Sequence, residues 1–196
     1  GAMLAETRTG DPRDFRNFVC AVIDEASFDN CMDYINYAKN SPDAEILYGG
    51  AGDKSVGYFV QPTVIKTTDP HFRSMEEEIF GPILTVYVYD DARWTETLRL
   101  CDETSPYGLA GSVFAADRAA IEEAKSLLRY AAGNFYINDK TTAASVGLQP
   151  FGGSRASGTN DKAGTRLNLS RWVSPRTIKE NLLPPRDFKY PYMMED

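Results

Sequence analysis

Alternation between short apolar runs and amphipathic runs in the middle of the chain most constrains what this sequence can fold into. Residues 83–89 (ILTVYVY), 109–115 (LAGSVFA) and 134–138 (NFYIN) are apolar on both faces, as strands buried inside a parallel sheet must be. Between them, residues 92–104 and the run that follows Asp117 place apolar side chains at helical spacing. The sequence therefore predicts an α/β fold, a parallel sheet with helices on both faces.

Two further elements are predicted before this region. Asp24 is a suitable helix N-cap, and after it apolar residues recur at helical spacing until Ser41-Pro42 ends the pattern: Phe28, Met32, Ile35 and Ala38. Residues 57–66 (GYFVQPTVIK) are rich in strand-forming residues but contain Pro62. Because proline has no N–H to donate to a neighbouring strand, residues 57–66 are predicted to form an edge strand or a bulged one.

The last third of the chain has a different character. Residues 139–166 carry six Gly or Pro and few large apolar side chains, which predicts a long irregular loop. Residues 168–181 (NLSRWVSPRTIKEN) alternate well enough to predict a long strand, and the tail after Leu183 is rich in proline and aromatic residues. Such a tail needs a partner surface to cover it.

Composition narrows the possible partners. The chain has 21 Lys and Arg against 28 Asp and Glu, and this net charge of −7 disfavours binding to a nucleic-acid backbone. No apolar run approaches the ~20 residues that a membrane span requires. The three cysteines form no CxxC pair, and His71 is the only histidine, so no metal site is predicted and a reducing compartment is favoured.

Two segments carry candidate chemistry, although neither GxGxxG nor GxxxxGK[ST] occurs. The first is residues 76–82 (EEEIFGP) and the second is residues 150–158 (PFGGSRASG). An interpretation without any function takes the first segment as the acidic end of a helix and the second as a surface loop. Functionally, a carboxylate accepts hydrogen bonds from both hydroxyls of a ribose, an aromatic ring supplies a wall for a flat heterocycle, and glycines admit a ligand close to the backbone.

Three motifs, taken in order, resemble the C-terminal part of aldehyde dehydrogenases: EEIFGP at 77–82, NFYIN at 134–138 and PFGG-x-x-x-SG at 150–158. The longer runs GNFYINDK (133–140) and PFGGSRASGTNDKAG (150–164) resemble the Δ1-pyrroline-5-carboxylate dehydrogenase family, also called L-glutamate γ-semialdehyde dehydrogenases. The resemblance extends from about residue 10 to the tail. It implies the catalytic-domain fold of these enzymes and NAD as the cofactor.

The resemblance also implies roles for five residues. Glu78 matches the glutamate that holds the nicotinamide-ribose hydroxyls and Phe80 the phenylalanine beside it, so both are expected to bind NAD. Phe151 matches the aromatic residue that lines the aldehyde site. Ala143 and Ala144 occupy the substrate-binding stretch in which the family has Gly-Ser. The backbone N–H donors persist there, but a hydroxyl is lost, at a cost on the order of 1.5–3 kcal/mol if it bonded a charged group.

None of the three cysteines in the chain is predicted to be a catalytic nucleophile. Cys20 lies within an apolar run, and Cys31 and Cys101 lie on predicted helices beside acidic residues, which oppose thiolate formation. Each cysteine is therefore interpreted as a small buried hydrophobe. A Gly-rich cofactor domain is missing as well, so the chain alone is expected to bind NAD weakly or not at all and to be inactive.

Three hypotheses follow. The first is that the chain is part of an NAD-dependent dehydrogenase that oxidises L-glutamate γ-semialdehyde, formed from Δ1-pyrroline-5-carboxylate, to L-glutamate in proline catabolism. The resemblance then implies the mitochondrial matrix in a eukaryote and the cytoplasm in a bacterium. The second is a naturally truncated, non-catalytic relative that acts as a binding or assembly module. The third is a structural domain whose motifs are idle.

Domain boundaries follow from the same observations. Residues 1–3 are interpreted as the scar of a cleaved tag, and residues 4–166 as a partial aldehyde dehydrogenase catalytic domain. Residues 167–196 are predicted to be an oligomerisation strand, at 168–181, and a C-terminal arm. The expected partners are a small-molecule substrate and further copies of the chain, with no nucleic acid and no membrane.

Overall fold

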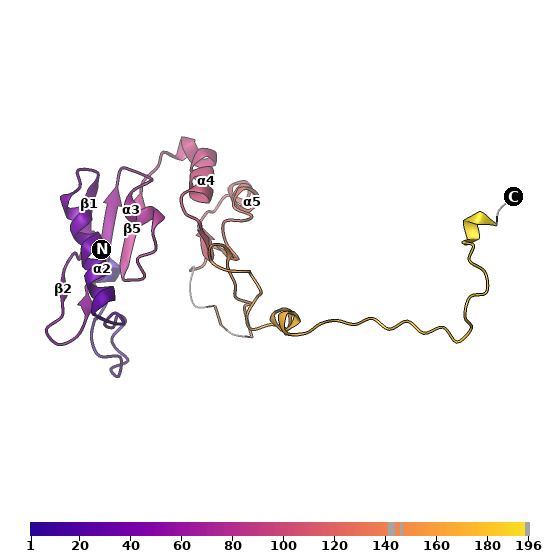
Figure 1. Cartoon of the computed structure of the whole chain (residues 1–196). Coiled ribbons are helices and arrows are strands. Elements are labelled where there is room, and N and C mark those ends of the chain that lie inside the picture. Colours follow the sequence, from indigo (N-terminus) through magenta and orange to yellow (C-terminus); the bar gives the residue numbers. More distant parts are fainter. Residues whose placement is uncertain (141–143, 146, 195–196) are drawn as a thin grey trace.

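The computed structural model describes residues 1–140, 144–145 and 147–194. It contains two folded lobes, which follow one another along the chain, and an extended tail that leaves the second lobe (Figure 1). A short helix, α1 (Ala2–Ala5), opens the first lobe. No described helix is long and apolar enough to cross a membrane.

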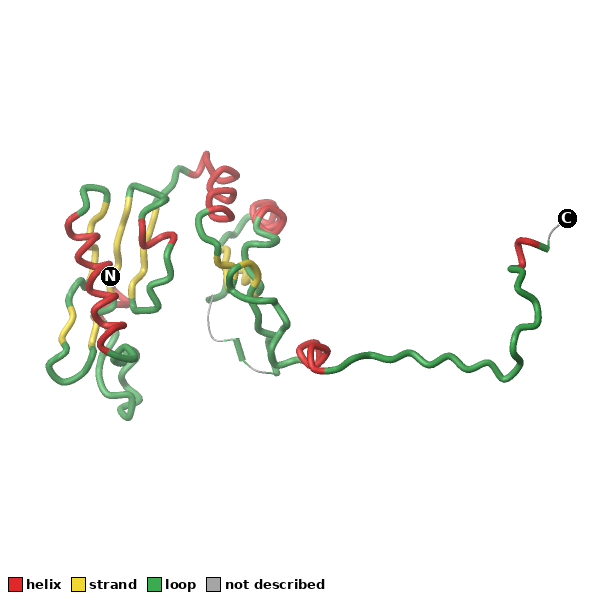
Figure 2. Tube along the Cα trace, viewed as in Figure 1, coloured by secondary structure: helices red, strands yellow, loops and turns green. Residues whose placement is uncertain are grey.

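A three-stranded sheet forms the centre of the first lobe, in the order β1–β4–β5 (Figure 2). β1 (Ala44–Tyr48) runs antiparallel to β4 (Thr63–Thr67), and β4 runs parallel to β5 (Ile83–Tyr87). Helices α2 (Glu25–Asn40) and α3 (Arg73–Glu76) pack against this sheet. Two short strands pair separately, β2 (Gly52–Asp53) with β3 (Phe59–Val60). The sheet is therefore mixed, where a parallel one was predicted.

Helix α2 is confirmed, together with the cap that begins it. The Asp24 carboxylate accepts a hydrogen bond of 2.7 Å from the backbone N–H of Ser27, which satisfies one of the free donors of the first turn. The buried face differs from the predicted stripe in two ways. Met32 is only half-buried, and Cys31 and Tyr34 join the interior. The buried residues of α2 are Phe28, Cys31, Tyr34, Ile35 and Ala38.

The prediction for residues 57–66 was wrong in one respect. The segment divides into β3 and β4, and β4 is the central strand of the sheet instead of an edge. Pro62 lies in the break just before β4, where no ladder bond requires its missing N–H. Thr63, Ile65 and Thr67 alternate inward and are at most 2% exposed, as a half-buried strand requires.

Within the described residues, helices cover one face of this sheet, not both as predicted. Ile65 packs with Ala38 of α2 and with Phe72, which immediately precedes α3. On the opposite face, Leu47 and Leu84 remain 52% and 60% exposed. Because strand side chains alternate between the faces, the partners Glu45 and Lys66 also lie on this second face, which therefore exposes apolar and charged side chains together.

The second lobe is built on a parallel pair, as the alternation of strands and helices predicted. β7 (Ala110–Val113) and β8 (Asn134–Ile137) are parallel neighbours, connected through α5 (Arg118–Leu127). Helix α4 (Trp94–Glu103), preceded by the 3₁₀ turn η1 (Asp91–Arg93), packs beside α5. The shared core contains the buried residues Leu98, Val113, Ala124 and Leu128.

The predicted strand at 168–181 was wrong for this chain. Helix α6 (Arg166–Leu169) and the 3₁₀ turn η2 (Ser170–Trp172) take up its first residues. The remainder is extended, and in the described part of the chain no strand pairs with it before the last turn, η3 (Pro191–Met193). An extended segment becomes a strand only when a neighbour accepts and donates its backbone hydrogen bonds.

Candidate functional site

The loop that joins α3 to β5, residues 77–82, displays two of the predicted site residues. Glu78 is exposed, and the Phe80 ring is 84% exposed. Phe80 adopts a φ of 61°, a left-handed conformation that non-glycine residues seldom take. The next residue must be glycine, because a Cβ on Gly81 would lie 2.2 Å from the Cys31 sulfur. The chain thus turns tightly against α2 and presents Phe80 outward.

Side chains from α2 and α3 hold this loop. The Tyr34 hydroxyl donates to the Glu77 carboxylate. The Asn30 side-chain amide donates to the backbone carbonyl of Ile79 at 3.2 Å. Arg73 donates to Glu77 at 3.1 Å, and its guanidinium lies 4.1 Å from the centre of the Tyr34 ring. The loop is therefore fixed at two of its residues by neighbouring helices.

The charges around Glu77 reinforce this arrangement. The hydrogen bond from Tyr34, and then the bond from Arg73, lower the pKa of the Glu77 carboxyl below its ordinary value of 4.5. The same bond to Glu77 raises the pKa of the Tyr34 hydroxyl. At neutral pH, Glu77 is consequently an ionised acceptor and Tyr34 a protonated donor, the states in which their hydrogen bond is strongest.

The loop that carries Phe151 is held from both sides by Asn134, the first residue of β8. Its Nδ2 donates to the Pro150 carbonyl at 2.9 Å, and its Oδ1 accepts from the Gly152 N–H at 3.2 Å. Phe151 itself exchanges two backbone hydrogen bonds with Ala163, of 3.0 and 2.6 Å, and is 39% exposed. The aromatic ring is thus presented by a backbone that is fixed at three consecutive residues.

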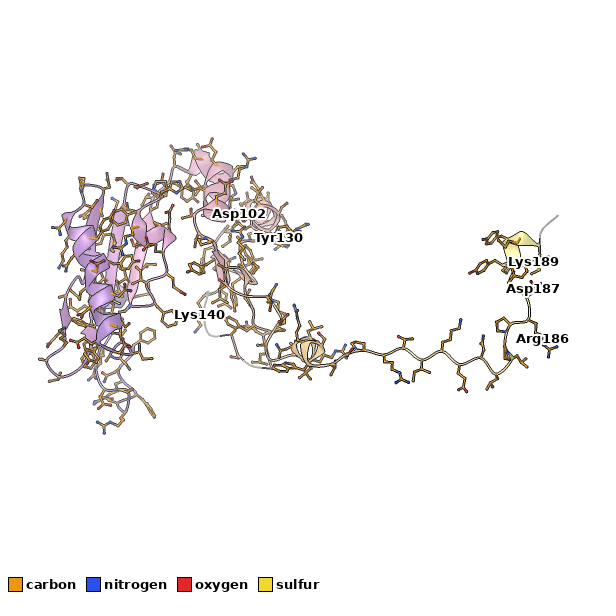
Figure 3. The ribbon with its side chains drawn as sticks, in the orientation of Figure 1. Asp102, Tyr130, Lys140, Arg186, Asp187 and Lys189 are labelled. Atoms are coloured by element: carbon orange, nitrogen blue, oxygen red, sulfur yellow. The ribbon has the colours of Figure 1, made fainter. Side chains whose placement is uncertain are left out.

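A second set of contacts fastens the end of this loop to the rest of the second lobe. Arg155 bonds both the backbone carbonyl and the carboxylate of Asp102, and the Ser154 hydroxyl donates to the Tyr130 carbonyl at 3.2 Å. Figure 3 labels Asp102 and Tyr130 close together in this lobe. The loop therefore rests on residues from α4 and from the turn that follows α5.

Residues 105–108 connect the two loops. The Ser105 hydroxyl donates to the Glu76 carbonyl at 3.4 Å, next to the 77–82 loop. Two residues later, β6 (Tyr107–Gly108) pairs with β9 (Ser154–Arg155). Within the described residues, no hydrogen bond joins Glu78 or Phe80 directly to Phe151. Ala144 is half-buried, and Ala143 lies outside the described residues.

Comparison with known proteins agrees with this geometry. The sequence model described as "Aldehyde dehydrogenase family" matches residues 2–178. This chain belongs to the aldehyde dehydrogenase family. The resemblance that the motifs indicated is therefore confirmed, and it extends over both lobes and the start of the tail.

Three relatives place this aldehyde dehydrogenase chain within the family. The mitochondrial Δ1-pyrroline-5-carboxylate dehydrogenase of Dictyostelium discoideum is 63% identical over 188 residues, which are 96% of this chain and 34% of that protein. The mitochondrial enzyme of the same name from Homo sapiens is 52% identical over 197 residues, covering 98% and 35%. The Mycobacterium tuberculosis enzyme, solved with NAD bound, gives a TM-score of 0.82 at 48% identity, covering 98% and 35%. This chain spans about a third of their length.

Two of the three cysteines of this aldehyde dehydrogenase chain, Cys31 and Cys101, lie in settings that do not favour a thiolate. All three thiols are free, but only Cys31 is buried as predicted. The prediction was wrong for Cys101, which is exposed on α4, and Cys20 is only half-buried. Burial raises the pKa of the Cys31 thiol, which is fully buried behind Gly81. Desolvation also raises the pKa of the Cys101 thiol, at the wall of an apolar pocket of about 300 Å³ between β5 and α4. That none of them is the nucleophile stays a prediction.

Sequence reasoning did not identify the residues that hold the two loops. Tyr34 carried a usable signal, because a tyrosine on the buried face of a helix needs a partner for its hydroxyl. Arg73 carried a weak one, the spacing of four residues to Glu77. Asn30 and Asn134 carried none, since their partners are backbone groups far away in the sequence. The Asn30 bond, for example, spans 49 residues.

Proposed function

We propose that this chain is part of an NAD-dependent dehydrogenase that oxidises L-glutamate γ-semialdehyde to L-glutamate. The observation that carries the proposal is the 63% identity with a Δ1-pyrroline-5-carboxylate dehydrogenase across 96% of the chain, which includes both motif-bearing loops. Two differently anchored loops that each display an aromatic ring fit a site for a cofactor and a small substrate. The overall reaction converts an aldehyde and water to a carboxylate, with two electrons passing to NAD.

Glu78 and Phe80 suit a nicotinamide riboside. The Glu78 carboxylate is exposed and can accept hydrogen bonds from two vicinal hydroxyls at once, and the exposed Phe80 ring supplies an apolar wall beside it. When bound, NAD takes up the hydride that leaves the aldehyde carbon. The role proposed for this chain is to hold the ribose and thereby fix the distance between the cofactor and the aldehyde.

Phe151 and the alanine pair define the proposed substrate side. The Phe151 ring would line the aldehyde site, and the backbone N–H groups of Ala143 and Ala144 would bind the substrate carboxylate. Because alanine replaces serine in that pair, the carboxylate would have one donor fewer than in the family pattern. The nucleophile is expected from the two thirds of the relatives' length that this chain does not span.

The proposed location follows the relatives. Those from Dictyostelium, cattle and human are named as mitochondrial, so we propose the mitochondrial matrix if the source is a eukaryote and the cytoplasm if it is a bacterium. The reducing chemistry of these compartments agrees with three free thiols.

The test uses the full-length protein that contains this chain. Wild-type protein should form NADH from glutamate semialdehyde, and Glu78→Gln should raise the KM for NAD about tenfold to a hundredfold, because a charge-assisted bond is lost. Glu96→Gln is a matched control, since Glu96 pairs with Arg93 at 2.8 Å on the surface of α4. Absence of NADH formation by the wild-type protein would refute the proposed activity.

Residues 167–196 are proposed to mediate association with further copies of the chain. The tail carries exposed apolar side chains, including Trp172, Leu182 and Phe188 at 81%, 89% and 88% exposure. Figure 3 shows the charged residues Arg186, Asp187 and Lys189 on the same tail, away from both lobes. An extended apolar segment of this kind invites pairing with another chain. Light scattering should report an oligomer that dissociates when residues 173–196 are removed, and a monomer before removal would contradict the proposal.

A further inference from the structure

Helix α2 contacts every second residue of the 77–82 loop. Tyr34 bonds the side chain of Glu77, Asn30 bonds the carbonyl of Ile79, and Cys31 lies against Gly81. The two residues between these contacts are Glu78 and Phe80, the pair proposed to bind NAD.

We infer that Asn30 and Tyr34 are positioning residues for the cofactor, which they hold in register through the 77–82 loop. The inference rests on the proposed function, because it takes Glu78 and Phe80 as the ligands of NAD. It assigns α2 a role in cofactor affinity although neither residue touches the cofactor itself.

The spacing of the contacts explains how one helix can do this. Residues 30, 31 and 34 lie at i, i+1 and i+4, so they share one face of α2. Glu77 is extended where the loop leaves α3, so the side chains of Glu77 and Glu78 point to opposite sides. Phe80 departs from this alternation with its φ of 61°, and the turn there leaves its ring facing solvent. Exposure agrees, because Ile79 packs against the α2 core while Phe80 is 84% exposed.

The Tyr34 anchor is itself held in place by its neighbours. Tyr34 is 4% exposed, and its ring is covered by the Arg73 guanidinium. Arg73 in turn bonds Asp33 of α2 at 2.9 Å, so the side chains around Glu77 tie α2 to α3. A loop in which Phe80 keeps a positive φ needs such support, because that conformation persists only where its surroundings impose it.

Loss of an anchor should therefore lower the fraction of molecules in which Glu78 and Phe80 are correctly placed. The apparent dissociation constant for a ligand rises in inverse proportion to that fraction. NAD should bind more weakly, whereas the aldehyde, which the Phe151 loop is proposed to contact, should not. A role limited to general stability would lower both affinities together.

The experiment measures NAD binding by calorimetry, in the full-length protein, for Tyr34→Phe, Asn30→Ala and the double variant. Tyr37→Phe is the matched control, because it removes the same hydroxyl from a tyrosine three residues further along α2, whose ring packs on Phe72 at 5.1 Å. Each single variant should raise the dissociation constant for NAD about threefold and the double variant about tenfold, with the KM for aldehyde unchanged within about twofold.

The outcomes separate this inference from the proposed function. Wild-type protein that binds NAD but does not oxidise glutamate semialdehyde would refute the activity, while the binding series would still test the anchors. Variants that bind NAD as tightly as Tyr37→Phe would overturn the inference, as would an equal loss of NAD and aldehyde affinity or a wild-type protein that does not bind NAD. Asn30 is exposed, so Asn30→Ala keeps the test decisive even if Tyr34→Phe fails to fold.

Discussion

Replacement of Asn134 by alanine should release the loop that carries Phe151. The Asn134 side chain bonds the residue before Phe151 and the residue after it, at 2.9 and 3.2 Å. Alanine removes the donor and the acceptor together and leaves the backbone of β8 intact. The two backbone bonds between Phe151 and Ala163 should keep the loop near its place but less firmly.

The size of the effect follows from these two bonds. Each intramolecular hydrogen bond contributes about 0.5–1.5 kcal/mol net, so the pair stabilises the closed loop by about 1–3 kcal/mol. That free energy corresponds to an approximately 5- to 150-fold change in the equilibrium between the closed and open loop. If opening exposes the amides, their exchange with solvent should accelerate by the same factor.

Hydrogen exchange of the 196-residue chain measures this directly. In Asn134→Ala, the amides of Phe151 and Gly152 should exchange at least about fivefold faster, while those of the central strand β4 keep their rates. Asn138→Gly is the matched control. Asn138 directly follows the other end of β8 and makes an equivalent pair of hydrogen bonds, of 2.9 and 3.0 Å, to the backbone of Ala115. Glycine tolerates the φ of 53° that Asn138 adopts. The control should accelerate exchange at Ala115 alone.

Two results would refute this reasoning. Unchanged exchange at Phe151 and Gly152 in Asn134→Ala would show that the asparagine does not hold the loop. Equal acceleration at Ile65 in the first lobe would show that the substitution destabilises the whole chain instead. In the full-length protein, the released loop should raise the KM for aldehyde and leave the KM for NAD unaltered.

Three further predictions test other parts of the site. The 196-residue chain should form no NADH with glutamate semialdehyde, because desolvation raises the pKa of the Cys31 and Cys101 thiols and the nucleophile is expected in the part of the relatives' length that this chain does not span. Turnover that Cys101→Ser abolishes would contradict this. In the full-length protein, Ala144→Ser should lower the KM for aldehyde about tenfold by restoring a donor to the substrate carboxylate, and steady-state kinetics would show it. The lowered pKa of Glu77 means that its ionised carboxylate stabilises the fold. This contribution is complete at pH values above 4.5, the ordinary pKa, and is lost as the pH falls through the folded-state pKa. Melting temperatures of wild type and Glu77→Gln should therefore differ at neutral pH and converge once the pH lies below the lowered folded-state pKa of Glu77. A constant difference across that range would argue against the effect.

Local physics made several elements predictable from sequence. Asp24 caps α2 because its carboxylate reaches the backbone N–H three residues ahead, a contact that depends on local geometry alone. The parallel pair β7–β8, joined by α5, followed from the apolar period and from the length of the connection. The motifs at 77–82 and 150–158 were likewise sufficient to indicate the family.

Contacts between distant residues were beyond sequence reasoning. The central place of β4 depends on β1 and β5 both pairing with it, and Pro62 appeared to argue against a central strand until the break before β4 was seen. The segment at 168–181 alternates like a strand, yet it is unpaired here, because pairing needs a second backbone that local sequence does not supply.

The sequence by itself determined which residues are proposed to carry the chemistry, since Glu78, Phe80 and Phe151 stand in the motifs that resemble the family. Only the tertiary structure decided how they are held: by Asn30 and Tyr34 on one helix, and by Asn134 on one strand. The reason is physical. A side chain's chemical capacity is a local property, whereas its orientation is set by hydrogen bonds to backbone and side-chain groups that the fold brings together.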